Sequence, residues 1–330
     1  MSVIFTENLS RSFKTRDYAV RSKGLKGWLE KPVFKTVKAV DDLSFSIAAG
    51  EKVAFIGPNG AGKSTTLKML CGLLRPSGGS AQVCGFVPWD KPQELSRQIG
   101  LVFGQRSHLW PALPVQDSFD LLASIYNLDQ AAYAAQRNKL IEVFGLQDFL
   151  GQTARTLSLG QRMRCDIAAA LLHQPAILFL DEPTIGLDVT AKALLRDHLN
   201  KLAHEFETTI LLTSHDTDDI ERICGRVILI DHGKKLIDTD LVSLKRDYAR
   251  NKTLRLATVE AQPRYEISGV KIISQAPHQI TLSVDTNIIA LEQVVADCLG
   301  RFKLQDIAIE DFPLEEVIKN IYAGKSYETR

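Results

Sequence analysis

The sequence predicts an α/β domain that is followed by a smaller α+β domain. From residue 57 onward, helical and strand patterns alternate, which is typical of α/β domains. The runs "AILFLDEP" and "TTILLTSHD" are short and continuously apolar, as expected for strands buried on both faces of a sheet. Beyond residue 250 the pattern changes to shorter strands with two helices. We therefore expect one domain over residues 1–250 and a second over residues 251–330.

The composition is that of an ordinary folded protein. Of the 330 residues, 45% are hydrophobic, and the net charge of +1 gives no general attraction to nucleic acid. The cysteines have no metal-binding spacing, which favours reduced and mostly buried thiols in a reducing compartment. They are Cys71, Cys84, Cys165, Cys224 and Cys298.

Neither a membrane span nor a signal peptide is predicted. The apolar runs are far shorter than the ~20 residues that cross a bilayer. The N-terminal stretch "MSVIFTENLSRSF" lacks the basic and apolar regions of a signal peptide. We expect the protein to stay in the cytoplasm, so that any attachment to a membrane depends on another polypeptide.

The first domain is expected to begin with strands over residues 1–13 and 37–56, which alternate partly between apolar and polar residues. Between them, residues 14–36 form a basic insertion that carries seven Lys or Arg residues against two acidic ones. A solvated loop is one interpretation of this insertion. A basic surface close to anionic headgroups or to a partner is the other.

Helices and strands then alternate. A helix is expected after the glycine-rich loop, and helical segments over 115–150 and 160–173 belong to a helical subdomain of about 106–173. The stretch "RVILIDHGKKLIDT" predicts a hairpin with its turn at His232 and Gly233. In the second domain, "TLRLATV", "QITLSVD" and "LQDIAIED" predict strands, with helices around 288–299 and at "PLEEVIKNIYA".

The strongest motif is the glycine-rich loop "GPNGAGKST", which lies between an apolar strand and a helix. Glycines allow the backbone to turn successive N–H groups toward phosphate oxygens. Lys63 supplies a positive charge for the phosphates, and the Ser64 hydroxyl is a ligand for Mg²⁺. The phosphate-binding residues expected here are Gly57, Pro58, Asn59, Gly60, Ala61, Gly62, Lys63, Ser64 and Thr65.

Acidic and imidazole side chains follow two of the apolar strands. Asp181 ends the first run, where it can hold Mg²⁺, and Glu182 beside it can polarise an attacking water. His215 ends the second run and is placed to contact the terminal phosphate. Gln105, which follows "IGLVFG", is expected to sense both the Mg²⁺ and the water.

The stretch "TLSLGQRMR" at residues 156–164 predicts a helix start that presents N–H groups to an anion. Together with the glycine-rich loop, "LFLDEP", "SHD" and "GLD" at 186–188, it resembles the nucleotide-binding subunit of an ATP-binding cassette (ABC) transporter over residues 1–240. The resemblance implies a P-loop NTPase cassette with a RecA-like core, a helical subdomain and an antiparallel β subdomain. It also implies ATP hydrolysis with ATP and Mg²⁺ as cofactors.

The resemblance further implies that two such subunits pack head to tail. Each "LSLGQ" stretch then caps the ATP that is held by the glycine-rich loop of the other subunit, which is the same chain or a close paralogue. Asp188 would lie at the seam between the subunits. The residues that bind the partner's ATP would be Ser158, Leu159, Gly160 and Gln161. Leu159 departs from the family, which usually has glycine there, but a backbone N–H needs no particular side chain.

An aromatic residue of the N-terminal strand stacks on adenine in this family. Its position after "ENLSRS" favours Phe13, and the insertion leaves Tyr18 and Phe34 as alternatives. Further along, "SHLWPALPVQD" is expected to expose Leu109, Trp110 and Pro111 for docking to a membrane partner, although Trp110 could instead be a core residue.

The "LSLGQRMR" form is similar to a bacterial branch of export-type cassettes that act with separate transmembrane permease subunits. This implies a peripheral protein on the cytoplasmic side of the inner membrane. The alternatives are an importer ATPase, a soluble cassette ATPase that acts on DNA or ribosomes, and a non-hydrolysing regulator. DNA-acting cassettes carry long coiled coils and ribosomal ones carry two cassettes; neither feature is predicted here. The resemblance implies that the binding site for the transported molecule belongs to a different polypeptide.

Overall fold

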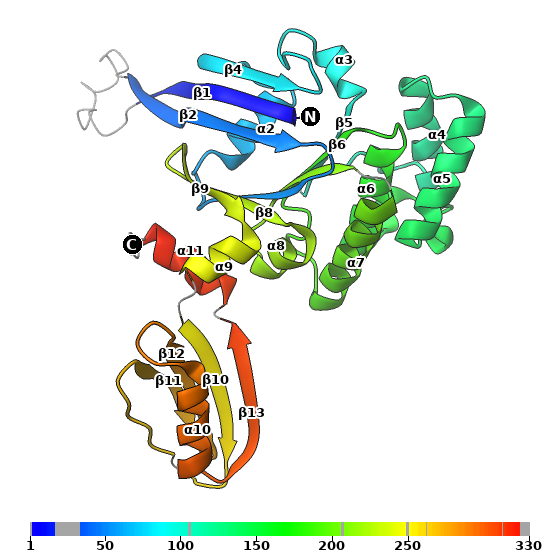
Figure 1. The fold of residues 1–330 in the computed structure, drawn as a ribbon. Coiled ribbons are helices and arrows are strands. Elements are labelled where there is room, and N and C mark those ends of the chain that lie inside the picture. Colours follow the sequence, from blue (N-terminus) through cyan, green and yellow to red (C-terminus); the bar gives the residue numbers. More distant parts are fainter. Residues whose placement is uncertain are drawn as a thin grey trace, which may run out of the picture. The chain divides into compact units, whose positions relative to one another are not determined.

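The computed structural model describes residues 2–16, 34–104, 107–205, 208–248, 251–261, 263–311 and 313–323 (Figure 1). The chain divides into two compact units, Met1–Asp238 and Thr239–Arg330. A cassette that extends to residue 250 stays a proposal. Residues 17–33 of the basic insertion lie outside the described part.

The central sheet of the first unit confirms the α/β prediction. Within the described residues its strand order is β5-β6-β7-β3-β8-β9, and the pairs from β5 to β8 are parallel. Asp181 lies opposite Thr213 on one side and Phe103 on the other, so the carboxyl ends of three strands meet. The strands are β3 (Lys52–Ile56), β5 (Ile99–Phe103), β6 (Ile177–Asp181), β7 (Thr209–Thr213), β8 (Arg226–Asp231) and β9 (Lys234–Asp240).

The hairpin between β8 and β9 turns at the predicted position. His232 has φ 46° and Gly233 has φ 79°. Two successive positive φ values define the tight turn that suits a two-residue hairpin. The pair His-Gly in the sequence therefore located this turn correctly.

A separate antiparallel sheet has the order β2-β1-β4 and lies beside the central sheet (Figure 1). Its strands are β1 (Ser2–Arg16), β2 (Phe34–Ala48) and β4 (Gly78–Val83). Ile4 and Phe45 from this sheet share one apolar core with Phe55 of β3 and Leu67 of α2 (Lys63–Leu70). The antiparallel β subdomain is thereby fixed to the central sheet next to the glycine-rich loop.

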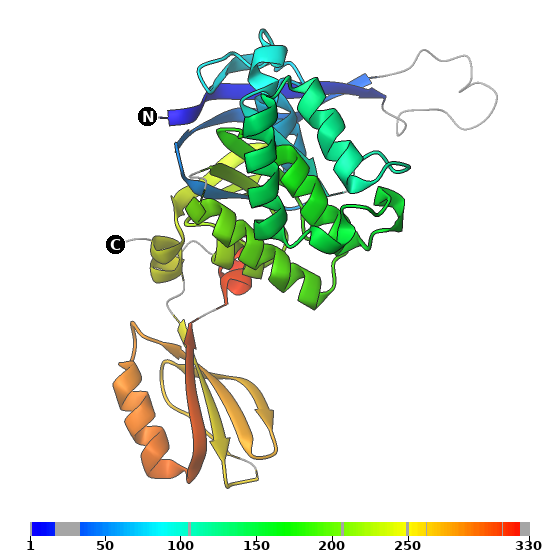
Figure 2. The ribbon, with the colours of Figure 1, turned by 90° about the vertical axis from the view of Figure 1, so that its right-hand side faces the viewer.

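The other helices of the first unit pack around the central sheet and on one another. Figures 1 and 2 show α4 and α5 beside α6, and both helices pack on α6. The remaining bounds are α3 (Pro92–Ser96), α4 (Val115–Ile125), α5 (Gln130–Phe144), α6 (Leu159–Leu171), α7 (Val189–Glu205) and α8 (Thr217–Ile223), with 3₁₀ turns at Gln147–Phe149 and Ala154–Thr156.

The second unit is an α+β domain, as the short strands and helices predicted beyond residue 250 indicate. Among its described residues the sheet order is β11-β12-β10-β13, with antiparallel pairs throughout. Helix α10 covers one face through Val294 and Cys298. The elements are α9 (Leu241–Tyr248), β10 (Asn251–Thr258), β11 (Val270–Ala276), β12 (Gln279–Asp285), α10 (Leu291–Arg301), β13 (Leu304–Asp311) and α11 (Leu314–Tyr322).

Two expectations from composition can be compared with the structure. The cysteines are free thiols, all buried except the half-buried Cys84, and burial raises the pKa of Cys84 to about 11 and that of Cys165 to about 12. These thiols are therefore poor nucleophiles. In the part of the chain that the structure describes, every helix is too short or too polar to pass through a bilayer.

Candidate functional site

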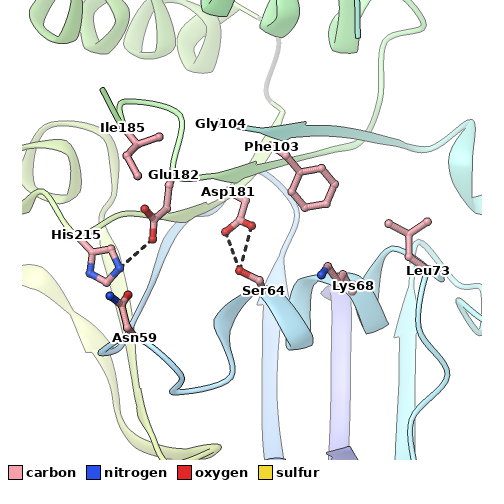
Figure 3. A pocket seen from close by; sticks show the side chains of 10 residues that line it. All are labelled: Asn59, Ser64, Lys68, Leu73, Phe103, Gly104, Asp181, Glu182, Ile185 and His215. Atoms are coloured by element: carbon pink, nitrogen blue, oxygen red, sulfur yellow. Dashed lines mark hydrogen bonds and ion pairs between the residues drawn. The ribbon is translucent and has the colours of Figure 1, made fainter. Parts of the chain in front are cut away.

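A cavity of about 740 Å³ opens where β3, β5, β6 and β7 end (Figure 3). Five of its lining residues were expected from the sequence, and the other five were missed. The described residues that line it are Asn59, Ser64, Lys68, Leu73, Phe103, Gly104, Asp181, Glu182, Ile185 and His215. The loop residues and the acids, which lie far apart in the sequence, are thus brought together at one edge of the sheet.

The glycine-rich loop has the backbone that phosphate binding requires. Gly60 and Gly62 have φ values of 83° and 107°, a region that side chains rarely tolerate. At Gly62 an added Cβ would also lie 2.4 Å from the carbonyl oxygen of Ala39. Gly62 is the N-cap of α2 and offers no side-chain cap, so the N–H groups of the first helical turn are available to an anion.

Lys63 bends back over its own loop. Its Nζ donates to the carbonyl oxygens of Gly57 at 2.6 Å and Pro58 at 3.3 Å. Burial lowers the pKa of the Lys63 ammonium, and the nearby carboxylates of Glu182 and Asp181 oppose that shift. A cation at the mouth of a loop rich in N–H groups is suited to phosphate.

Ser64, Asp181 and Thr213 form a connected oxygen cluster below the loop. Ser64 Oγ donates to Asp181 Oδ2 at 3.1 Å (Figure 3), and Thr213 Oγ1 donates to Asp181 Oδ1 at 2.6 Å. A hydroxyl and a carboxylate are the hard ligands that Mg²⁺ takes, and Mg²⁺ usually completes its shell with water and substrate phosphates. The donor set therefore fits Mg²⁺. Thr213 was not singled out from the sequence, although it directly precedes the "SHD" stretch.

Glu182 and His215 are neighbours in the lining of the cavity and contact each other (Figure 3). Nε2 of His215 lies 2.9 Å from Oε1 of Glu182 and 3.3 Å from Nζ of Lys63. Only one of these can be a hydrogen bond at a time. A protonated Nε2 donates to Glu182, whereas a bare Nε2 accepts from Lys63. Which of the two neighbours His215 bonds to therefore depends on whether its Nε2 carries a hydrogen.

The backbone of Glu182 is unusual. Its φ is 53°, which costs a non-glycine residue of order 1 kcal/mol. The conformation is held because its N–H group bonds to the carbonyl oxygen and the hydroxyl of Thr213, at 3.0 and 3.1 Å. The carboxylate is thereby aimed into the cavity (Figure 3).

The predicted helix start at residues 156–164 is confirmed, because α6 begins at Leu159 with Ser158 as its N-cap. Ser158 Oγ accepts from the N–H of Gln161 at 3.2 Å, and the Gln161 side chain accepts from the N–H of Ser158 at 2.9 Å. In this capping box Ser158 Oγ is an acceptor, so its own hydroxyl hydrogen can still be donated. At Gly160 an added Cβ would lie 2.9 Å from Cβ of Ala191, so α6 and α7 approach closely there.

Residues 158–161 are absent from the described lining of the cavity. The glycine-rich loop and the start of α6 are therefore two separate helix N-termini of the described chain, and only the first adjoins the cavity. Asp188 is exposed and directly precedes α7, and its Oδ1 accepts from the N–H of Ala191 in the first turn of that helix at 2.8 Å. Leu159 does not have a positive φ, so its N–H group is oriented as in any first helical turn.

Several other residues singled out from the sequence can be located. Phe13 pairs with Val37 between β1 and β2, and the guanidinium of Arg11 lies 4.8 Å from its ring centroid. Phe34 is 59% exposed at the start of β2, and Tyr18 lies outside the described residues. Gln105 also lies outside the described residues, so its predicted role stays a prediction.

The expected exposure of the docking segment was wrong at Leu109. This side chain is only 3% exposed, Trp110 is half-buried, and Pro111 is exposed. The segment is held inward because the N–H of His108 and the hydroxyl of Ser107 both donate to Asp166 on α6, at 2.7 and 2.8 Å. Leu109 follows this anchor directly and therefore joins the core.

A glycine-rich loop, a strand-end aspartate, an adjacent glutamate and a following histidine around one cavity define a P-loop nucleotide-binding cassette. Comparisons with known proteins agree with this assignment to a nucleotide-binding cassette. The ABC transporter family matches residues 40–185. Over 210 residues the chain is 36% identical to the ABC transporter ATP-binding protein NatA of Bacillus subtilis, which covers 64% of this chain and 85% of that protein. The chain belongs to the ABC transporter family and is an ATP-binding, ATP-hydrolysing subunit.

Two further proteins extend the comparison. The daunorubicin/doxorubicin resistance ATP-binding protein DrrA of Streptomyces peucetius is 35% identical over 265 residues, or 80% of this chain and 78% of that protein. The solved dimeric structure of the cassette MJ0796 bound to ADP and Pi, described as a post-hydrolysis state, is similar with a TM-score of 0.59 and 25% identity. It covers 72% of this chain and 98% of that one.

Proposed function

We propose that this chain drives export of a small molecule by hydrolysing ATP beside separate transmembrane permease subunits, at the cytoplasmic side of the inner membrane. The observation that carries export is the likeness to DrrA, a resistance protein by its name, over 80% of this chain. The "LSLGQRMR" form at residues 157–164 supports the same export branch. The support for hydrolysis is the position of Glu182 and His215 in the lining of the cavity.

The phosphate groups of ATP would bind the N–H groups of residues 57–65 and the ammonium of Lys63. Lys63 would exchange its bonds to Gly57 and Pro58 for phosphate oxygens. Ser64 and Asp181, with Gln105, would hold Mg²⁺, which neutralises negative charge on the phosphates when bound. Phe13 would stack on the adenine.

Glu182 would accept a proton from the attacking water, since its carboxylate points into the cavity beside the phosphate loop. His215 would hold that water and the terminal phosphate in line through the nitrogen that now contacts Glu182.

Two chains would complete each site by packing head to tail about a two-fold axis. The support is that Ser158 has a hydroxyl hydrogen to donate at a helix N-terminus, yet residues 158–161 do not line the described cavity of their own chain. The partner's phosphate is the anion that fits this helix start. Asp188, which is exposed just before α7, would lie at the seam.

This arrangement predicts that hydrolysis depends on protein concentration. The rate per chain should fall steeply on dilution below the dissociation constant of the dimer, because a single chain holds two incomplete sites. Steady-state phosphate release over a dilution series measures the dependence. A rate per chain that stays constant down to fully monomeric protein, as judged by light scattering, would contradict the paired site.

Leu159→Gly is expected to retain ATP turnover within about tenfold, a change of less than about 1.4 kcal/mol in the activation free energy. The contribution proposed for residue 159 is its N–H group, which the substitution keeps. Glycine at the first helical position also costs at most about 1 kcal/mol of helix stability. Turnover measured at saturating ATP tests this expectation. A collapse of activity would show that the leucine side chain itself is needed.

A further inference from the structure

A buried carboxylate lies outside the cavity and is not explained by the proposed roles. Asp219 on α8 has an exposed fraction of 0%. Its Oδ2 accepts from Thr184 Oγ1 at 2.5 Å and from Ser214 Oγ at 2.8 Å, while its Oδ1 accepts from Arg196 Nε at 2.5 Å. Three donors from three different segments therefore converge on one side chain.

Two of these donors are close in sequence to the reacting groups. Thr184 lies two residues after Glu182, and Ser214 directly precedes His215. One oxygen of Asp219 thus holds the loop that carries the glutamate and the loop that carries the histidine. The side chain of His215 is itself 43% exposed, so its position relative to Glu182 depends on how the two loops are held.

The third donor joins this cluster to α7. The guanidinium of Arg196 on α7 also contacts Asp216 at 3.1 Å and Asp218 at 3.6 Å, and Lys192 contacts Asp216 at 2.7 Å. A buried charge pair is costly unless its geometry is good and its remaining bonds are satisfied. Here the Asp219 carboxylate has three donors, and Arg196 has carboxylates on three residues.

We propose that Asp219 is a positioning residue for hydrolysis, which sets the distance between Glu182 and His215 by holding Thr184 and Ser214 on one oxygen and Arg196 on the other. This inference rests on the proposed roles of Glu182 and His215. The carboxylate does not touch the cavity, so it acts on the orientation of these groups and not on nucleotide binding. Misplacing a reacting group by about 1 Å can reduce turnover by about 10²-fold.

The test separates turnover from affinity in the full-length protein. Asp219→Asn keeps the shape of the side chain but removes its charge, and Thr184→Val removes one donor at nearly constant volume. Both should lower kcat by about 10- to 100-fold, the loss that misplacement by a fraction of an ångström to 1 Å produces. Both should leave the dissociation constant for ATP, measured by calorimetry, within about threefold, because the phosphate loop is untouched.

Matched variants separate positioning from stability. Thr184→Ser keeps the hydroxyl and should have a kcat close to that of the unchanged protein. Comparing it with Thr184→Val tests the inference even if Asp219→Asn does not fold. Asp238→Asn removes another carboxylate paired with arginine and lysine, on β9, and should leave kcat within about twofold. The inference is overturned if Thr184→Val turns over like the unchanged protein, or if Thr184→Ser is as slow as Thr184→Val. If the unchanged protein shows no hydrolysis that depends on Glu182, the proposed function fails instead.

Discussion

Glu182→Gln is expected to bind ATP with nearly unchanged affinity and to lose about 10²- to 10⁴-fold in turnover, the contribution of a positioned general base. Glutamine keeps the length of the side chain and can still accept a hydrogen bond from His215 at the position where the structure places Oε1. It cannot take a proton from water. The loss should therefore appear in kcat alone, measured as phosphate release at saturating ATP.

The same variant should accumulate as a dimer in ATP and Mg²⁺, because the closed pair would form without being opened by hydrolysis. Size-exclusion chromatography with and without ATP measures this. Glu182→Asp is a matched control, since it keeps a base but withdraws it by one methylene, and it should retain more activity than the glutamine variant. A Glu182→Gln protein that stays monomeric in ATP would contradict the head-to-tail arrangement.

Lys63→Ala is expected to weaken ATP binding by about 10- to 100-fold. A hydrogen bond to a charged group contributes about 1.5–3 kcal/mol, and each 1.4 kcal/mol is about tenfold in affinity. The fold should tolerate the change, because the present partners of Lys63 Nζ include two carbonyl oxygens of an already preshaped loop. Calorimetric titration with ATP and Mg²⁺ gives the affinity.

Lys68→Ala is the control for this measurement. Lys68 is an exposed lysine on the same helix and lines the cavity, so its removal lowers the net charge of the protein by the same single unit. Affinity within about threefold of the unchanged protein is expected for Lys68→Ala, since an exposed charge contributes little. Equal losses in both variants would mean that Lys63 acts only through general electrostatics.

The sequence predicted the central part of the site well. The glycine-rich loop has a local backbone requirement, and the central residues of β6 and β7 are apolar because both faces of these strands are buried. Since parallel strands end at one edge, the order of the motifs was enough to bring Ser64, Asp181 and His215 together. These features depend on short-range chemistry that can be read along the chain.

Other features depend on distant parts of the fold. The stretch "HDTDDIERI" contains three aspartates, and only the packing of α7 against α8 decides that Asp219 is the buried one. Leu109 was misjudged because its burial depends on Asp166, more than fifty residues away. Strand β11 was missed because its residues are largely exposed and show no alternation. The positive φ of Glu182 has no signal in its residue type.

The close approach of Gly160 to Ala191 has a mechanical consequence. With room for only a hydrogen atom between α6 and α7 at this point, the two helices cannot rotate independently there. A side chain at residue 160 would have to push α6 and α7 apart, which would move the helix that starts at Ser158 relative to the helix that carries Arg196.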